Sequence, residues 1–203
     1  MENFIQVRID DYVDCKRCEK LCKSRSQIVW GYGVMRPIVM FVGEAPGAIE
    51  DEQGKPFVGP AGETHHAFLE DAGIPDKLIY TTNAVLCRPV TGDMPKIAEN
   101  RTPSLDEVKN CRDRLVQEIL IVDPLVIVAL GKIGFYALTG KNTPIKSDFG
   151  NIIDTNIGGV RFPVMYVFHP SYLRTKGTDE EIGLQKKAYD FLKKVIDYWT
   201  SLD

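Results

Sequence analysis

Residues 38–62 read IVMFVGEAPGAIEDEQGKPFVGPAG, where an apolar run breaks into a loop holding five glycines, three prolines and four carboxylates. The run predicts a buried strand, and a strand that ends in glycine and proline places polar side chains at its carboxyl end. Open α/β sheets build their ligand sites at that end. The loop is therefore predicted to be an enzyme active site, with Glu44, Glu50 and Phe57 as first candidates.

Short apolar runs bounded by turn formers predict buried, parallel strands at residues 37–42, 78–86, 125–130 and 162–168. Helical patterns alternate with them at 61–72, 105–121, 132–139 and 180–199. The second helix follows Ser104, with Glu107 three residues on, which is a capping-box signature. The alternation predicts an α/β fold, a three-layer sandwich with a central four-stranded parallel sheet flanked by helices.

Length and charge restrict the class of protein. The chain has 203 residues, 44% of them hydrophobic, which suits a single domain over residues 1–203, expected to be a monomer. No apolar run approaches the roughly 20 residues that span a bilayer, and the N-terminus lacks a signal pattern, so a cytoplasmic protein without a membrane partner is expected. The net charge of −3 gives nucleic-acid binding no bulk support, so any phosphate contact must come from local basic patches.

Five cysteines are many for a reducing compartment, and they are Cys15, Cys18, Cys22, Cys87 and Cys111. Structural disulfides are rare there, and a Cys-x-x-Cys pair more often binds metal. Free buried thiols are the alternative, which suits Cys22 but not the pair Cys15 and Cys18 among charged residues. Metal ligation is the prediction.

Polar residues also follow the other predicted strands. Asn83, Gly131 with Lys132, and His169 with Ser171 should meet the first loop at one edge of a parallel sheet. Together they predict a pocket with a carboxylate, an amide, an aromatic ring and an imidazole. The stretch 88–104 has three prolines and no periodicity, which is typical of a functional or mobile loop.

Six ordered motifs, spread over nearly the whole chain, resemble the iron–sulfur uracil-DNA glycosylases, family 4 of the uracil-DNA glycosylase superfamily. They are Cys15-x-x-Cys18, the loop at 43–62, TNAVLCRP at 82–89, NRTPS at 100–104 with Cys111, VALG at 128–131 and HPSYL at 169–173. The resemblance implies a DNA-repair enzyme that hydrolyses the N-glycosidic bond of flipped-out deoxyuridine, releases uracil and leaves an abasic site.

The resemblance also implies a cofactor. Cys15, Cys18, Cys87 and Cys111 would hold a 4Fe–4S cluster, with Cys22 left over. The cluster would tie the N-terminal segment to the loop between Cys87 and Cys111. Tetrahedral zinc on the same four sulfurs remains an alternative.

By the same resemblance, each pocket residue acquires a role. Phe57 would stack on the flipped base, and Asn83 would pair its amide with uracil O4 and N3–H. A neutral His169 would donate a hydrogen bond to O2 and stabilise the departing anion. Glu44 would help order the catalytic water, and Glu50 would lie near C5 and exclude the methyl group of thymine.

Backbone and DNA contacts complete the implied site. Gly43 and Ala45 would belong to the base-binding loop, and Ala45 stands where the better-known branch of the superfamily carries a water-activating carboxylate. DNA contacts are expected from Ser171, Leu173 and Arg174. Leu173 is equally compatible with a wedge inserted into the duplex and with a place in the core.

The chain departs from the family pattern in places. The span from Cys87 to Cys111 is long, the HPSYL tail is one residue short, and Thr64-His65-His66 stand where two leucines are usual. His65 and His66 are expected at the surface, with altered substrate choice or phosphate contact as the alternative. Residues 88–110 contain no histidine, which excludes the covalent trapping chemistry of a related branch.

Two other functions remain open. The first is a glycosylase-fold module that binds modified or uracil-containing DNA without base release, suggested by the unusual histidines and the long loop. The second is a metal-dependent protein with a substrate other than nucleic acid, suggested by the acidic balance.

Overall fold

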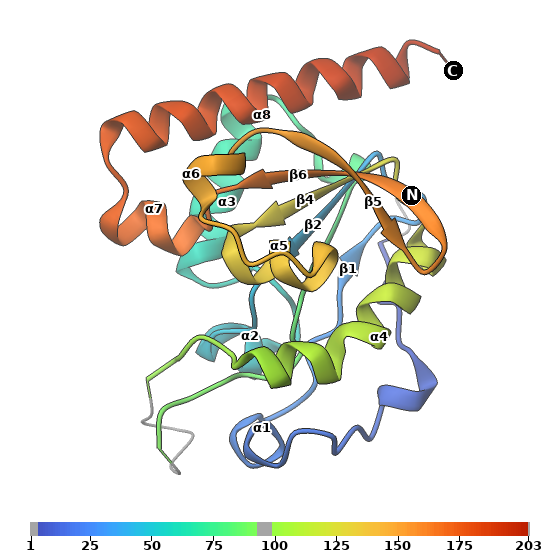
Figure 1. Cartoon of the computed structure of the whole chain (residues 1–203), viewed down its shortest axis with the longest axis vertical. Coiled ribbons are helices and arrows are strands. Elements are labelled where there is room, and N and C mark those ends of the chain that lie inside the picture. Colours follow the sequence, from blue (N-terminus) through green and yellow to red (C-terminus); the bar gives the residue numbers. More distant parts are fainter. Residues whose placement is uncertain (1–3, 93–98, 203) are drawn as a thin grey trace.

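A mixed β-sheet runs through the centre of the computed structural model, which describes residues 4–92 and 99–202 (Figure 1). Its strands are β1 (Tyr32–Gly33), β2 (Val39–Gly43), β3 (Ile79–Asn83), β4 (Val126–Leu130), β5 (Ile152–Ile157) and β6 (Val160–Val167). They lie in the order β1-β3-β2-β4-β6-β5. The four central strands are parallel, and β1 and β5 pair antiparallel at the two edges.

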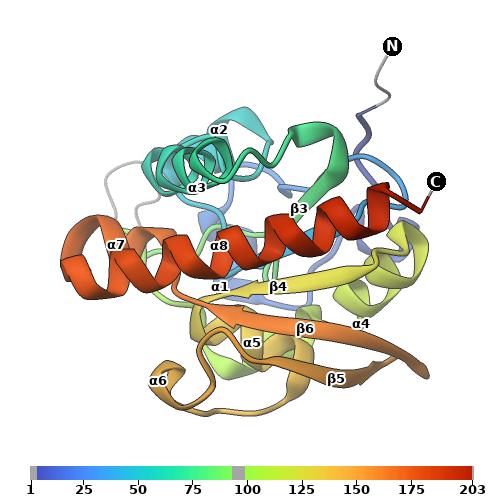
Figure 2. The same ribbon diagram turned by 90° about the horizontal axis from the view of Figure 1, so that it is seen from above.

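Helices cover both faces of this sheet (Figures 1 and 2). They are α1 (Glu19–Ser24), α2 (Ala48–Gln53), α3 (Pro60–Asp71), α4 (Leu105–Val122), α5 (Gly131–Thr139), α6 (Ile145–Asp148), α7 (Pro170–Lys176) and α8 (Asp179–Thr200). Helices α3, α7 and α8 pack against one face, and α4 and α5 against the other. Within the described residues, no helix combines the length and apolarity needed to cross a membrane.

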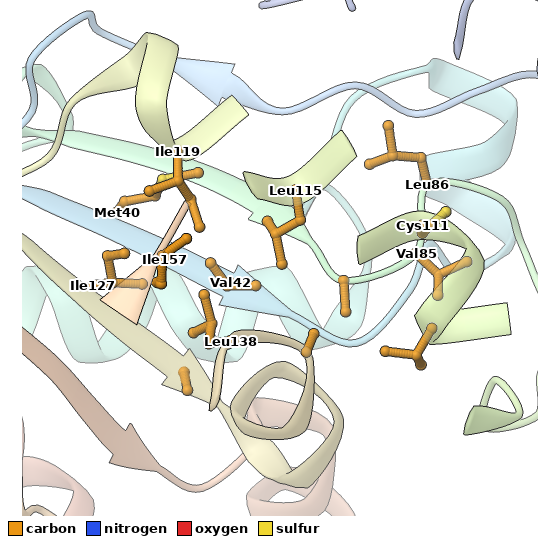
Figure 3. Packing of buried hydrophobic residues seen from close by; sticks show 14 of the residues in the cluster. Met40, Val42, Val85, Leu86, Cys111, Leu115, Ile119, Ile127, Leu138 and Ile157 are labelled. Atoms are coloured by element: carbon orange, nitrogen blue, oxygen red, sulfur yellow. The ribbon is translucent and has the colours of Figure 1, made fainter. Parts of the chain in front are cut away.

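The alternation of side chains along β2 builds the core on both faces. Met40 and Val42 face the cluster under α4 and α5, where Leu115 and Ile119 meet them (Figure 3). Phe41, between them, faces the cluster under α3 and α8. Strands β2, β3 and β4 are therefore buried along their whole length, as expected for the centre of a sheet that helices cover on both faces.

The α/β prediction is confirmed, and the four expected strands are the parallel ones. The number of strands was wrong, because β1 and β5 extend the sheet at its edges. Strand β1 has only two residues, and β5 is exposed at alternate positions, so neither forms an apolar run. The four expected helices agree with α3, α4, α5 and α8 within one residue at each end.

The predicted strand 78–86 ends early, at Asn83. Beyond it the N–H of Ala84 donates to the carbonyl of Gly43 and that of Val85 to the carbonyl of Glu44. Apolar residues continue because 84–86 pack into the core beside α4, not because the strand goes on. The capping box predicted at Ser104 is present, with the Ser104 Oγ accepting from the N–H of Glu107 and the Glu107 carboxylate accepting from the N–H of Ser104.

Candidate active site

The register of the parallel strands brings the predicted polar residues to one edge of the sheet. Gly43 at the end of β2 lies opposite Asn83 at the end of β3. A cavity of about 520 Å³ opens there, and its wall includes Glu44, Glu50, Phe57, Asn83, His169 and Ser171. Ala45 and Arg174 line it as well, whereas Gly43, Lys132 and Leu173 are not in its wall.

His169 is held as a neutral ring with a defined proton position. It is the N-cap of α7, where its Nδ1 accepts the N–H of Ser171 at 3.2 Å and lies 2.7 Å from the Ser171 Oγ. Because Nδ1 is an acceptor, the single proton of the neutral ring sits on Nε2. Burial lowers the pKa of His169 to about 4, so the ring is neutral at physiological pH.

Phe57 forms its part of the wall in a rarely populated backbone conformation. Its φ is 55°, in the left-handed region, and its side chain is 7% exposed. A Cβ on Gly62 would stand 2.0 Å from the Phe57 carbonyl oxygen, and a Cβ on Gly43 would stand 2.6 Å from the Phe57 ring. The two glycines therefore make room for this loop, and backbone strain of this kind is typical of functional sites.

Glu50 holds together the loop at residues 43–62 through its two carboxylate oxygens. One carboxylate oxygen accepts the N–H of Gly59 at 2.7 Å, and the other accepts the N–H of Gly47 at 3.1 Å. The side chain is 8% exposed, so it joins the start of α2 to the start of α3. Glu50 thus shapes the wall with both oxygens already engaged.

Glu44 is the carboxylate that lies partly open to the cavity. Burial raises its pKa, and a hydrogen bond with the side chain of Thr102 acts in the opposite direction. The neighbouring Ala45 packs against the core beside α4 and brings no polar group to the cavity. Glu44 is therefore positioned to hold water or a polar substrate group.

The turn after Asn83 rests on a buried ion pair that sequence reasoning missed. Arg114 and Glu118 of α4 are fully buried and bonded to each other, and Nη2 of Arg114 donates to the carbonyls of Asn83 and Ala84 at 2.7 and 2.9 Å. Glu118 in turn accepts the hydroxyl of Thr82 at 2.9 Å. The signal was available, since an arginine and a glutamate four residues apart interrupt the apolar face of this helix.

The long loop after Cys87 supplies a second missed part of the wall, formed by Asn100, Arg101 and Thr102. The loop doubles back on itself, with a bridge between Val90 and Asn100, and Nε of Arg88 donates to Oδ1 of Asn100 at 2.7 Å. The tip at 93–98 lies outside the described residues. The length of the loop pointed to a function without indicating which residues would face the site.

The four expected cysteine ligands lie at one corner of the core. Cys87 and Cys111 are buried in the cluster under α4 (Figure 3 labels Cys111), and Cys15 and Cys18 pack against it. Burial raises the pKa of the Cys87 thiol to about 12; its interaction with Cys111 and Cys15 adds to the rise, so the sulfurs lie within electrostatic reach of one another. Nη1 of Arg25 donates to Sγ of Cys87 at 3.1 Å and acts in the opposite direction.

The donor set of that corner is all thiol, which suits a soft metal or an iron–sulfur cluster. In the described part of the chain, no three His, Cys, Asp or Glu side chains converge closely enough to hold a metal ion. A four-iron cluster places each cysteine on a different iron, so its four sulfurs stand farther apart than the ligands of one ion. The chemistry of these four thiols fits such a cluster.

The structure contradicts the surface position expected for His65 and places Leu173 in the core, which was one of the two alternatives for that residue. His65 was expected at the surface, but it is 1% exposed, between Phe41 and Tyr189. His66 is half-buried, with Nδ1 2.8 Å from the carbonyl of Gly62. Leu173 is 4% exposed and packs in the core under α8, because α7 turns that side chain inward. In this structure Leu173 holds α7 in place.

Comparisons with known proteins identify relatives of this chain. The sequence model of the uracil DNA glycosylase superfamily matches residues 30–199. A type-4 uracil-DNA glycosylase of Thermotoga maritima is 36% identical over 198 residues, which is 95% of this chain and 97% of that protein. Another, of Pyrobaculum aerophilum, is 39% identical over 167 residues, 79% of this chain and 81% of that protein. The crystal structure of Pedobacter heparinus SMUG2 has a similar fold, with a TM-score of 0.54 at 11% identity, covering 80% of this chain and 77% of that one.

Proposed function

Because this chain belongs to the uracil-DNA glycosylase superfamily and is a DNA-repair glycosylase that releases uracil, we propose that the bond is cleaved in the 520 Å³ cavity. The observation that carries the proposal is His169, a neutral imidazole whose Nδ1 is occupied by Ser171 and whose proton therefore sits on Nε2. A base buried in a duplex cannot reach such a cavity, so the nucleotide must be flipped out of the stack.

In this proposal His169 stabilises the leaving group. As the N-glycosidic bond breaks, negative charge grows on uracil O2, and the Nε2–H of His169 donates a hydrogen bond to it. The contact at Nδ1 fixes the tautomer with the proton on Nε2, and a donor fixed in advance needs no reorganisation during the reaction. Water then adds to the sugar carbon, the proton that it releases neutralises the uracil anion, and the products are uracil and an abasic site.

Asn83 and Phe57 recognise the base. The amide of Asn83 donates to O4 and accepts from N3–H, a pattern that cytosine reverses, so cytosine would leave buried groups unpaired. The ring of Phe57 stacks on the base. Support comes from the close approach of both side chains to Gly43, where a Cβ would stand 2.4 Å from Oδ1 of Asn83 and 2.6 Å from the Phe57 ring.

The remaining loop residues shape and hydrate the site. Glu44 orders the attacking water, with its carboxylate in the cavity wall. Glu50 fixes the wall on the C5 side of the base and narrows the space for a methyl group. Ala45 brings only a methyl group to this edge, and Gly43 leaves room for the side chains of Asn83 and Phe57.

Contact with the DNA backbone falls to the start of α7. Arg174 is exposed and lines the cavity, which suits a phosphate contact beside the flipped nucleotide. Ser171 is partly buried, and its hydroxyl contacts His169. We expect it to lie near the DNA because it lines the cavity beside Arg174. Leu173 enters the proposal only as support for α7, because its side chain is in the core.

A 4Fe–4S cluster is the proposed cofactor, held by Cys15, Cys18, Cys87 and Cys111. Bound there, it would supply a covalent cross-link between the N-terminal segment and the two ends of the long loop. A visible spectrum of the purified protein distinguishes the alternatives. Brown absorbance near 400 nm supports the cluster, and colourless protein with stoichiometric zinc would contradict it.

The proposal further assumes a cytoplasmic monomer acting on uracil-containing DNA. Incubating the protein with a uracil-containing oligonucleotide and then with alkali should cut the strand at the abasic site. A strand that stays intact would contradict base release. Tight, salt-dependent binding with an intact strand would instead favour a module that binds such DNA without cleaving the base.

A further inference from the structure

Helix α2 carries two adjacent buried carboxylates, and the proposed chemistry uses only one of them. Glu50 is 8% exposed and Asp51 is 2% exposed, whereas the next residue, Glu52, is exposed. Glu50 accepts its hydrogen bonds from the loop of the pocket wall. A carboxylate as deeply buried as Asp51 needs donors of its own, because an unpaired buried charge is costly.

Asp51 finds those donors in the chain that leaves α1. The N–H of Ser26 lies 3.0 and 2.8 Å from its two oxygens, and the N–H of Gln27 donates to one of them at 3.5 Å. Gln27 returns the contact, since its Nε2 donates to the carbonyls of Asp51 and Glu52 at 3.0 Å each. Side chains from both segments therefore join residues 26–27 to α2.

The same segment is anchored to the cysteine corner by Arg25. Its Nη1 donates to Sγ of Cys87 at 3.1 Å, and its Nη2 donates to the carbonyl of Cys15 at 2.7 Å. Arg25 directly precedes Ser26 in the chain. A continuous series of contacts thus leads from the cysteine corner to Asp51.

We propose that Asp51 is a positioning residue that ties the base-binding loop to the cysteine segment, so that order in each depends on the other. On the pocket side, the neighbouring Glu50 accepts the N–H of Gly59, two residues after Phe57, so that a shift of α2 would also move this loop. A carboxylate suits the task because it offers two acceptor oxygens and makes charge-assisted hydrogen bonds with backbone N–H groups. The inference rests on the proposed function only where it concerns uracil binding.

Hydrogen–deuterium exchange of the purified full chain tests the coupling directly. In Asp51→Ala, peptides from residues 22–30 and from residues 44–59 should both exchange faster than in the wild type. Asp51→Asn, the milder variant, keeps one acceptor oxygen and should show a smaller change of the same kind. Glu52→Gln is the matched control at the neighbouring exposed carboxylate, and it should leave both stretches unchanged.

Kinetics and a reciprocal variant complete the test. Asp51→Ala should raise KM for uracil-containing DNA by about 10-fold, with a smaller change in kcat, because His169 lies outside this series of contacts. Arg25→Gln should also speed exchange at 44–59, which a local role for Asp51 does not predict.

Faster exchange confined to residues 22–30, or a KM equal to that of Glu52→Gln, would overturn the coupling. A wild-type protein that releases no uracil sinks the proposed function instead, and the exchange result still decides this inference.

Discussion

His169 at the pocket edge and His65 in the layer behind it are both held neutral by burial, which lowers the pKa of His169 to about 4 and that of His65 to about 3. Their surroundings differ. His169 lines the cavity, and its Nδ1 accepts a backbone N–H that leaves the proton on Nε2. His65 shares a hydrogen bond of 2.9 Å with the Tyr189 hydroxyl, and its Nε2 has no hydrogen-bond partner in the described part of the chain.

This difference shows that a lowered histidine pKa is evidence of burial and is not by itself evidence of a catalytic role. Both rings lose their charge for the same reason, the desolvation of the protonated form. Only His169 adds a fixed proton position and access to a cavity, which catalysis by hydrogen-bond donation requires. His65 packs between Phe41 and Phe57, so its part is to support the ring of Phe57 from behind.

The largest expected effect comes from removing the imidazole at the pocket edge. His169→Ala should lower kcat for uracil release by about 10² to 10³, as for the loss of one donor to a developing oxyanion. Single-turnover release of uracil from an oligonucleotide measures this. His66→Ala, at a half-buried histidine of α3, is the control and should stay within about twofold of the wild type. A His169→Ala rate equal to that of the control would contradict a catalytic role for the histidine at the pocket edge.

Two glycines, Gly43 at the pocket edge and Gly62 in the layer behind it, differ in what an added Cβ would meet. A Cβ at Gly43 would meet the ends of the Asn83 and Phe57 side chains, whereas a Cβ at Gly62 would stand 2.0 Å from backbone of Phe57. Gly43→Ala should therefore lower kcat/KM by about 10², because small displacements of a reacting group are costly, and should leave the fold intact. Gly62→Ala should act on stability instead, by about 1 to 3 kcal/mol.

Gly183→Ala is the matched control for both glycine changes, because nothing lies within 4 Å of the Cβ it would add. In a helix this change should leave base release unaltered and add up to about 1 kcal/mol of stability. Equal losses of activity in Gly43→Ala and Gly62→Ala, measured on folded protein, would contradict the division between the two regions.

The pocket edge could be predicted from the sequence, and the layer behind it could not. Glu44, Asn83 and His169 follow apolar runs, and parallel strands bring their carboxyl ends to one edge whatever the rest of the chain does. His65 stands in a helix whose buried face is set by Phe41 and Tyr189, which are distant in sequence. A histidine beside another histidine carries no local sign of which one points inward.

The edge strand β5 was also missed, although the sequence carries a local signal for it. Strand β5 is half exposed and forms no apolar run, yet Gly158 and Gly159 join it to β6 as a two-residue turn typical of hairpins. That signal was local and readable. The contacts of Asp51 and of Arg114 were not, because each depends on a partner brought near only by the folded chain.

The burial of His65, in the layer behind the pocket, should make the free energy of unfolding depend on pH. Above the ordinary value of 6.5, His65 is neutral in both the folded and the unfolded chain and adds no pH dependence. Between pH 6.5 and about 3 the unfolded chain binds a proton that the buried ring cannot, so stability falls with falling pH by about 1.4 kcal/mol per pH unit.

His65→Leu should remove that part of the slope. In denaturant titrations at pH 6.5 and 4.5, the variant should lose about 2 to 3 kcal/mol less than the wild type, while His169 keeps its own contribution. His66→Gln serves as the control on the same helix and should follow the wild type. Parallel curves for His65→Leu and the wild type would show that the ring at 65 is charged in the folded state or accessible to solvent.

The smallest effects come from the two hydroxyls that meet the Nδ1 atoms, and they compare the two regions atom for atom. Ser171→Ala removes the Oγ that lies 2.7 Å from Nδ1 of His169 but keeps the backbone N–H on the same nitrogen. It should lower kcat by only about fivefold, the value of one hydrogen bond near 1 kcal/mol. Tyr189→Phe removes the corresponding hydroxyl from His65 and should cost about 1 kcal/mol of unfolding free energy with unchanged base release. The pair is decisive because the chemical change is the same at both histidines, so a kcat loss in Tyr189→Phe that matched Ser171→Ala would make His65 part of the catalytic machinery.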